Sequence, residues 1–210
     1  MNKDEQLEGI TPGISMLNDS GNKEEFAFGP ENRVVNERER AKLMLYLLDQ
    51  IEEAQVAKTH RRYLDDLIFL CKTNQSIGKM TETAHHAGPC TVGVRKTFVD
   101  VQGNIYPCEK VGEVPAMRLG NVFEGFDLER VKRLTNIGAL SEPECKECWA
   151  LHHCTICLCR CIDKDVMSRE AKLRHCAESK AEALTKMRDL CFLQMEGMDF
   201  EKLRSLQMAK

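Results

Sequence analysis

The segment CKECWALHHCTICLCRC, residues 145–161, places six cysteines within seventeen residues. Crowded thiolates repel one another and are costly to bury unless a cation neutralises them, and a bound metal ion deprotonates thiols outright. The spacing Cys145-x2-Cys148 lets two sulfur atoms converge from one tight turn, and Cys154-x2-Cys157 repeats that spacing. Zinc and iron–sulfur centres both accept four thiolates, so the residues predict a metal centre without deciding between them.

The composition and the ends of the chain favour thiols over disulfides. The chain has 210 residues, of which 42% are apolar and 30% charged, and a formal net charge of −3. Its start, MNKDEQLEGI, lacks the pattern of a secretion signal, and no run approaches the roughly 18 apolar residues of a membrane span. We therefore expect a cytoplasmic protein whose eleven cysteines serve metal binding or catalysis. Because no Lys/Arg block is present, we expect no nucleic acid and no membrane among its partners.

Cysteines outside the block extend the candidate ligand set. Cys71 and Cys191 fall in helical patterns, where a free cysteine packs as a small apolar residue, and we expect both in the core. The remaining cysteines exceed one tetrahedral site; they are Cys90, Cys108, Cys145, Cys148, Cys154, Cys157, Cys159, Cys161 and Cys176. His152 and His153 could join a zinc site, or they could be solvated residues of a turn.

The elements that must position these residues follow from hydrophobic periodicity. Helical spacing predicts helices over residues 37–58, 61–71, 127–134 with Asp127 as the N-cap, and 168–194 with Ser168 as the N-cap. The runs KTFVDV and NIYP flank QGN and predict a β-hairpin with Gly103 in its turn. We expect an α+β fold with a small hairpin-centred cluster domain flanked by helices. The expected parts are residues 1–88 (an irregular segment plus helices), 89–180 (the cluster domain) and 181–210 (a terminal helix).

The order of the cysteines resembles a known family. Between Cys90 and Cys108 the spacing is C-x12-G-x4-C, and the later series is Cys145-x2-Cys148-x5-Cys154, a cysteine soon afterwards, and the outlying Cys176. This series resembles the SPASM domain, the C-terminal module of radical S-adenosylmethionine enzymes that modify peptides and proteins. The segments DVQGNIYPCEKVGE, RLGNVFEGFD and CWALHHCTIC resemble maturases of cysteine-rich peptides, which install thioether crosslinks. The resemblance covers residues 89–176.

The resemblance implies two auxiliary 4Fe–4S clusters held by interleaved cysteines. For the second cluster it implies Cys145, Cys148, Cys154 and Cys176. For the first cluster it implies Cys90, Cys108 and one of Cys157, Cys159 or Cys161. This sequence departs from the family's pattern at two positions. The family's block ends in C-x3-C, which would place a cysteine at position 158, where this chain has Leu158. Some relatives have an extra cysteine ligand of the first cluster six residues after the first cysteine, where this chain has Lys96. The first cluster could then have three protein thiolates and one open iron.

The motif of the catalytic cluster, C-x3-C-x2-C, does not occur in this sequence. The resemblance therefore implies the C-terminal part of a radical enzyme, which alone should not cleave S-adenosylmethionine; that cofactor belongs to the full-length enzyme. The expected partners are a cysteine-rich precursor peptide and either the missing radical barrel or a redox partner. Two alternatives stay open: a stand-alone iron–sulfur electron carrier and a zinc-stabilised interaction module.

Overall fold

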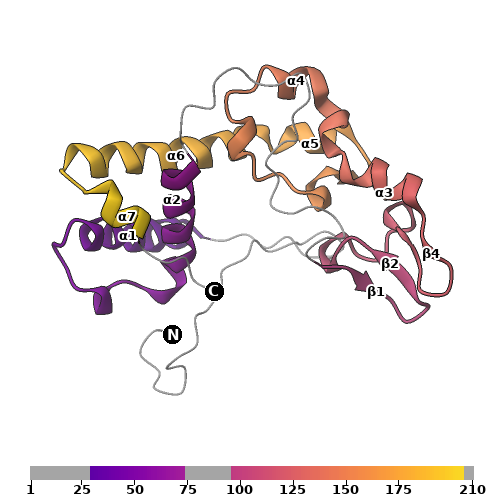
Figure 1. The fold of residues 1–210 in the computed structure, drawn as a ribbon, viewed down its shortest axis with the longest axis horizontal. Coiled ribbons are helices and arrows are strands. Elements are labelled where there is room, and N and C mark those ends of the chain that lie inside the picture. Colours follow the sequence, from indigo (N-terminus) through magenta and orange to yellow (C-terminus); the bar gives the residue numbers. More distant parts are fainter. Residues whose placement is uncertain (1–28, 74–95, 206–210) are drawn as a thin grey trace. The chain divides into compact units, whose positions relative to one another are not determined.

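The fold is known from a computed structural model that describes residues 29–73 and 96–205. It contains helices, a four-stranded antiparallel sheet and a two-stranded antiparallel sheet, so the α+β prediction is confirmed (Figure 1). The chain divides into two compact units, one formed by Met1–Gly78 with Thr185–Lys210 and the other by Lys79–Leu184. In the described part of the chain, no helix is long and apolar enough to cross a membrane.

The first unit is helical. It contains α1 (Pro30–Leu47), α2 (Arg61–Thr73), the end of α6 (Cys176–Met195) and α7 (Phe200–Ser205), with short 3-10 helices at Glu53–Gln55 and Lys58–His60. Apolar side chains spaced at helical intervals form its core, since that spacing gathers them on one face of each helix. The most completely buried of them are Leu43, Leu67, Ile68, Leu193 and Leu203.

A partly buried ion pair joins three helices of this unit. Arg40 Nη1 donates to both carboxylate oxygens of Asp189, at 2.7 and 2.9 Å, and Tyr63 Oη donates to Asp189 Oδ2 at 2.6 Å. Burial and the hydrogen bond to Asp189 raise the pKa of Tyr63, so the phenol stays protonated and remains a donor. The hydrogen bonds from Arg40 of α1 and Tyr63 of α2 thereby offset the free-energy cost of burying the Asp189 carboxylate.

The second unit is built on two hairpins. Strands β1 (Phe98–Val99), β2 (Asn104–Tyr106), β3 (Gly120–Asn121) and β4 (Gly125–Phe126) form one antiparallel sheet in sequence order. Its register pairs Val99 with Ile105 and Ile105 with Gly120. The predicted hairpin is β1–β2, and the structure adds β3 and β4, which were not predicted. The strand β2 leads directly to Cys108, so this sheet positions the first described cysteine of the unit.

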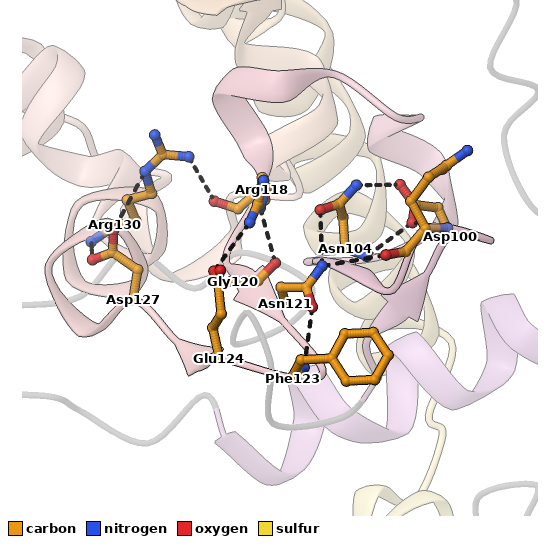
Figure 2. A network of polar contacts seen from close by, with 10 residues as sticks. Asp100, Asn104, Arg118, Gly120, Asn121, Phe123, Glu124, Asp127 and Arg130 are labelled. Atoms are coloured by element: carbon orange, nitrogen blue, oxygen red, sulfur yellow. Dashed lines mark hydrogen bonds and ion pairs between the residues drawn. The ribbon is translucent and has the colours of Figure 1, made fainter.

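Polar side chains hold the two hairpins together (Figure 2). The carboxylate of Asp100 accepts the backbone N–H groups of Gln102 at 2.9 Å and Asn104 at 2.8 Å, and the side-chain amide of Asn104 at 2.9 Å. From the second hairpin, Asn121 Nδ2 donates to Gln102 O at 3.3 Å and to Asn104 Oδ1 at 3.2 Å. Satisfying these backbone groups fixes the turn that precedes β2.

Gly103 serves the turn of the first hairpin, as predicted. Its φ of 81° lies in the left-handed region, which glycine adopts at little cost. Its N–H donates to Asp100 O at 3.0 Å and closes the turn. A Cβ at this position would lie 2.8 Å from Val122 Cγ2, so a larger residue would also displace that side chain of the neighbouring hairpin.

Short elements and the loops between them carry the cysteines from Cys145 to Cys161. The short elements of this unit are the 3-10 helices Glu109–Val111, Pro115–Met117, Ile137–Ser141, Leu151–His153 and Leu158–Cys161, with α3 (Leu128–Thr135), α4 (Glu142–Lys146), β5 (Ile162–Asp163), β6 (Val166–Met167) and α5 (Arg169–Arg174). Their apolar side chains share one core with the sheet. The half-buried cysteines Cys108, Cys154, Cys159 and Cys176 pack against that core.

Two of the predicted helices have different bounds in the structure. The helix predicted over residues 37–58 is α1, which begins at Pro30 and ends at Leu47, because the chain turns at Asp49 with a φ of 57°. The helix predicted over residues 168–194 is divided into α5 and α6 at His175, whose N–H bonds to Lys172 O in a tighter, 3-10-type turn. Both predicted N-caps are present: Asp127 accepts from Arg130 N–H and Ser168 from Ala171 N–H.

Candidate metal centre

Tight turns position Cys145, Cys148 and Cys154. Cys145 lies in α4, and the N–H of Cys148 bonds to its carbonyl at 3.2 Å. The N–H of Leu151 bonds to Cys148 O at 3.1 Å, and that of Cys154 to Leu151 O at 3.3 Å. Three successive hydrogen-bonded turns therefore separate the three thiols, all of which are half-buried.

Cys176, at the start of α6, completes a group of four thiols. Burial raises its pKa, and the negative charges of Cys154, Cys145 and Cys148 raise it further. These three are the other cysteines that the resemblance implies for the second cluster. The structure thus brings the sulfur atom of Cys176 within electrostatic range of the other three, although Cys176 is 22 residues from Cys154 in the sequence.

A side-chain bond from α6 holds Cys154 near Cys176. The N–H of Thr155 donates to Ser179 Oγ at 3.1 Å, and Thr155 Oγ1 donates to Glu182 Oε2 at 3.0 Å. Ser179 is buried, with 3% of its surface exposed. Since Ser179 lies three residues after Cys176, both face the same side of the helix, and this contact sets the approach of the loop to α6.

A second group contains Cys108, Cys157 and Cys159. Cys108 precedes the 3-10 helix Glu109–Val111, and the sulfur atoms of Cys157 and Cys159 lie 3.0 Å apart. The hydrogen bond from Cys159 lowers the pKa of Cys157, whereas the same bond, burial and the charge of Cys157 raise the pKa of Cys159. The charge of Cys108 raises it further, which places this thiol within range of the pair.

Cys161 and Cys90 differ from the others. Cys161 is fully buried, and its thiol lies 3.5 Å from Cys157 O. Burial raises its pKa to about 12, so without a metal it stays a thiol. Cys90, a predicted ligand of the first cluster, lies outside the described residues.

Two polar residues that the sequence analysis did not identify contact Cys145. Lys172 Nζ lies 3.6 Å from Cys145 Sγ, and Ser141 Oγ lies 3.2 Å from the same sulfur. Both side chains are fully buried. The signal available in the sequence was the position of Lys172 one helical turn before Cys176.

The two histidines of the block have different surroundings. His152 is half-buried, and its Nε2 is buried and has no hydrogen-bond partner in the described part of the protein. His153 has a partner. An unpaired buried ring nitrogen is costly, and a proton acceptor or a metal ion would satisfy it.

The donor set fits a thiolate-held metal centre by its chemistry. Among residues 29–73 and 96–205, no three His, Cys, Asp or Glu side chains are gathered closely enough to hold one metal ion. A tetrahedral ion with sulfur ligands at about 2.3 Å would require such a gathering. A 4Fe–4S cluster distributes its four thiolates over four irons, so it is held by sulfur atoms that lie further apart.

The two expected core cysteines have different positions. Cys71 is buried in the helical core, as predicted. The prediction for Cys191 is wrong, because this residue is exposed. It lies between the buried Leu190 and Leu193 in the sequence, and one residue of α-helix turns a side chain by about 100° away from the apolar face.

Comparison with protein-family models, curated proteins and solved structures gives no match to this chain. The resemblance to the SPASM domain therefore remains a prediction based on the cysteine spacing and the flanking segments.

Proposed function

We propose that this chain is the auxiliary-cluster part of a radical S-adenosylmethionine enzyme that modifies a ribosomal peptide by thioether crosslinking. The observation that carries the proposal is the grouping of its thiols. Cys176 lies within electrostatic range of Cys145, Cys148 and Cys154, and these four are the first group. Cys159 contacts Cys157 and lies within electrostatic range of Cys108, and these three are the second group. The buried Cys161 lies within range of thiols of both groups. The first group contains the four ligands that the family resemblance implies for one cluster. The second group contains Cys108 and two of the three cysteines from which the resemblance implies one further ligand of the other cluster.

The first group holds the ligands of the second cluster of the sequence analysis. It would bind one 4Fe–4S cluster through the thiolates of Cys145, Cys148, Cys154 and Cys176. The second group, with Cys90, would hold another through Cys108 and one thiol of the Cys157–Cys159 pair, which leaves one iron open. A bound cluster supplies one-electron transfer, or an iron on which a substrate thiolate binds. The protein's own residues orient these thiols: the turns of the block fix their order, and Ser179 draws Cys154 toward Cys176.

Serine variants test the proposal. Anaerobically reconstituted wild-type protein is expected to bind about eight iron and eight sulfide ions per chain, the content of two such clusters. Cys148→Ser is expected to lose about half of both, because it removes one ligand of the first-named group. The control Cys191→Ser changes an exposed thiol and is expected to keep the full content. Equal losses in both variants, or no iron in the wild type, would contradict the proposal.

The peptide partner can be tested separately. If the cluster held by Cys108 has an open iron, a cysteine-bearing peptide is expected to change the electron paramagnetic resonance of one reduced cluster and spare the other. A peptide with serine in place of cysteine is the matched control. A response of neither cluster would favour a stand-alone electron carrier.

A zinc-stabilised interaction module is the second candidate function. It is favoured by His152, whose buried Nε2 lacks a partner among the described residues and is a good zinc ligand. In that case His152→Ala would lower the zinc content, whereas the iron–sulfur proposal expects the metal content of this variant to be unchanged.

A further inference from the structure

A lysine ammonium lies buried beside the thiols. Lys172 is 1% exposed, and its Nζ donates to Ile137 O at 2.7 Å and to Cys145 Sγ at 3.6 Å. Among the described residues these acceptors are a carbonyl and a sulfur, and none is a carboxylate. A buried ammonium requires a compensating negative charge nearby.

Of the two acceptors of Lys172, the one that can carry a negative charge is the sulfur of Cys145. Cys145 is in direct contact, and the positive charge of Lys172 also lowers the otherwise raised pKa of Cys161. A centre held by four thiolates carries a net negative charge, so the ammonium is compensated when such a centre is bound. The buried cation thus fits an anionic metal centre at Cys145.

A second buried donor reaches the same sulfur. Ser141 Oγ lies 3.2 Å from Cys145 Sγ, and Ser141 is 0% exposed. When Cys145 is a metal-bound thiolate, the hydroxyl is the donor of this bond. The two donors come from different elements, since Ser141 ends the 3-10 helix Ile137–Ser141 and Lys172 lies in α5.

Other cations near the block lack these properties. Lys146 follows Cys145 directly, but its side chain is 61% exposed and pairs with Glu142 at 2.5 Å. Arg160 pairs with Glu178 at 2.8 Å. A carboxylate pairs with both of these cations, and solvent also screens Lys146, whereas Lys172 has no carboxylate among its described hydrogen-bond acceptors.

We propose that Lys172 and Ser141 are positioning residues that raise the reduction potential of the cluster held by Cys145, Cys148, Cys154 and Cys176. Reduction adds one electron to the cluster and makes it more negative, so a fixed positive charge and a hydrogen bond to its sulfur ligand stabilise the reduced form. The inference rests on the proposed function. It adds that buried residues of the protein set the reduction potential of one of the two clusters.

The test compares reduction potentials in Lys172→Met, Ser141→Ala and the control Lys146→Met. Methionine keeps the length of the side chain and removes its charge. Each reconstituted protein is titrated with dithionite, and the signals are followed by electron paramagnetic resonance. The signal missing from Cys148→Ser identifies the cluster concerned.

In Lys172→Met, the ratio of reduced to oxidised cluster at a fixed potential is expected to fall about tenfold, or about 59 mV for one electron. The other cluster and the Lys146→Met protein are expected to be unchanged. In Ser141→Ala, which keeps the charge, the ratio is expected to fall about threefold. This variant also provides the test if Lys172→Met does not fold.

An unchanged potential in a variant that retains both clusters would overturn the inference and leave the proposed function intact. Wild-type protein that takes up zinc and no iron would overturn both.

Discussion

The backbone N–H of Thr155 lies 3.1 Å from the hydroxyl of Ser179, so the residue after Cys154 is bound to α6 three residues beyond Cys176. This hydrogen bond holds the loop of Cys154 against the helix of Cys176, although the two cysteines are distant in the sequence. Residues that orient ligands in this way typically change metal affinity by about 10- to 100-fold when they are replaced.

We therefore expect Ser179→Ala to release one of its two clusters about tenfold faster to an iron chelator. The loss of the hydroxyl leaves Thr155 N–H without its acceptor and frees the loop that carries Cys154. Anaerobic absorbance during chelation measures the rate. Ser205→Ala, which removes an exposed hydroxyl bonded to Lys202 O, is the control. Identical rates in the two variants would show that the contact does not position Cys154.

Cys161 and Cys157 should differ in their effect on iron content. Cys161 is fully buried in the apolar core, whereas Cys157 is half-buried and paired with Cys159. We expect Cys161→Ala to keep both clusters and Cys157→Ala to lose iron from the cluster that Cys148→Ser retains. Iron analysis with electron paramagnetic resonance separates these outcomes. If Cys161→Ala lost iron and Cys157→Ala did not, Cys161 would be identified as the ligand of that cluster.

The two cysteines outside the metal groups should differ in stability. Cys71→Ser places a hydroxyl in the helical core and is expected to lower the free energy of unfolding by about 1–3 kcal/mol. Cys191→Ser changes an exposed side chain and is expected to stay within about 0.5 kcal/mol of the wild type. Urea unfolding followed by circular dichroism measures both. Equal losses would place Cys191 in the core.

The turn before β2 should respond to acid through Asp100. Burial acts to raise the pKa of this carboxyl, but hydrogen bonds from Asn104 and Gln102 outweigh burial and hold the pKa below its usual range. A depressed carboxyl pKa stabilises the fold above the unfolded value of about 3.9, and that stabilisation is lost as the pH falls through the folded value.

Asp100→Asn removes this titration. The free energy of unfolding of the wild type should therefore exceed that of the variant at pH 6, and the difference should shrink below about pH 4. Urea unfolding of both proteins over this range measures the difference. A difference that stays constant with pH would mean that the carboxylate does not stabilise the turn in its charged form.

Local signals in the sequence were sufficient for several elements. The turn chemistry around Gly103 predicted the first hairpin, and the caps at Asp127 and Ser168 marked the starts of α3 and α5. The strands β3 and β4 were missed because each has two residues, too few for an alternating pattern. The break at His175 was missed because an apolar period continues through it.

The sequence predicted which cysteines belong to the candidate site, but it did not predict which other side chains contact them. Cysteine spacing identified the thiols of the block, whereas the roles of Lys172 and Ser141 depend on burial, which spacing does not give. Lys146 and Arg160 lie inside the cysteine block in the sequence, but in the structure both pair with glutamates. Cys191 was misplaced for a related reason, since helical membership alone does not determine which face a residue occupies.

The central claim, that these thiols hold iron–sulfur clusters, is tested most directly by the metal content of protein purified without oxygen. Iron, acid-labile sulfide and zinc are measured on the same sample, together with its visible absorption. The account predicts a brown protein with iron and sulfide near the content of two 4Fe–4S clusters per chain. A colourless, folded protein with stoichiometric zinc would contradict it.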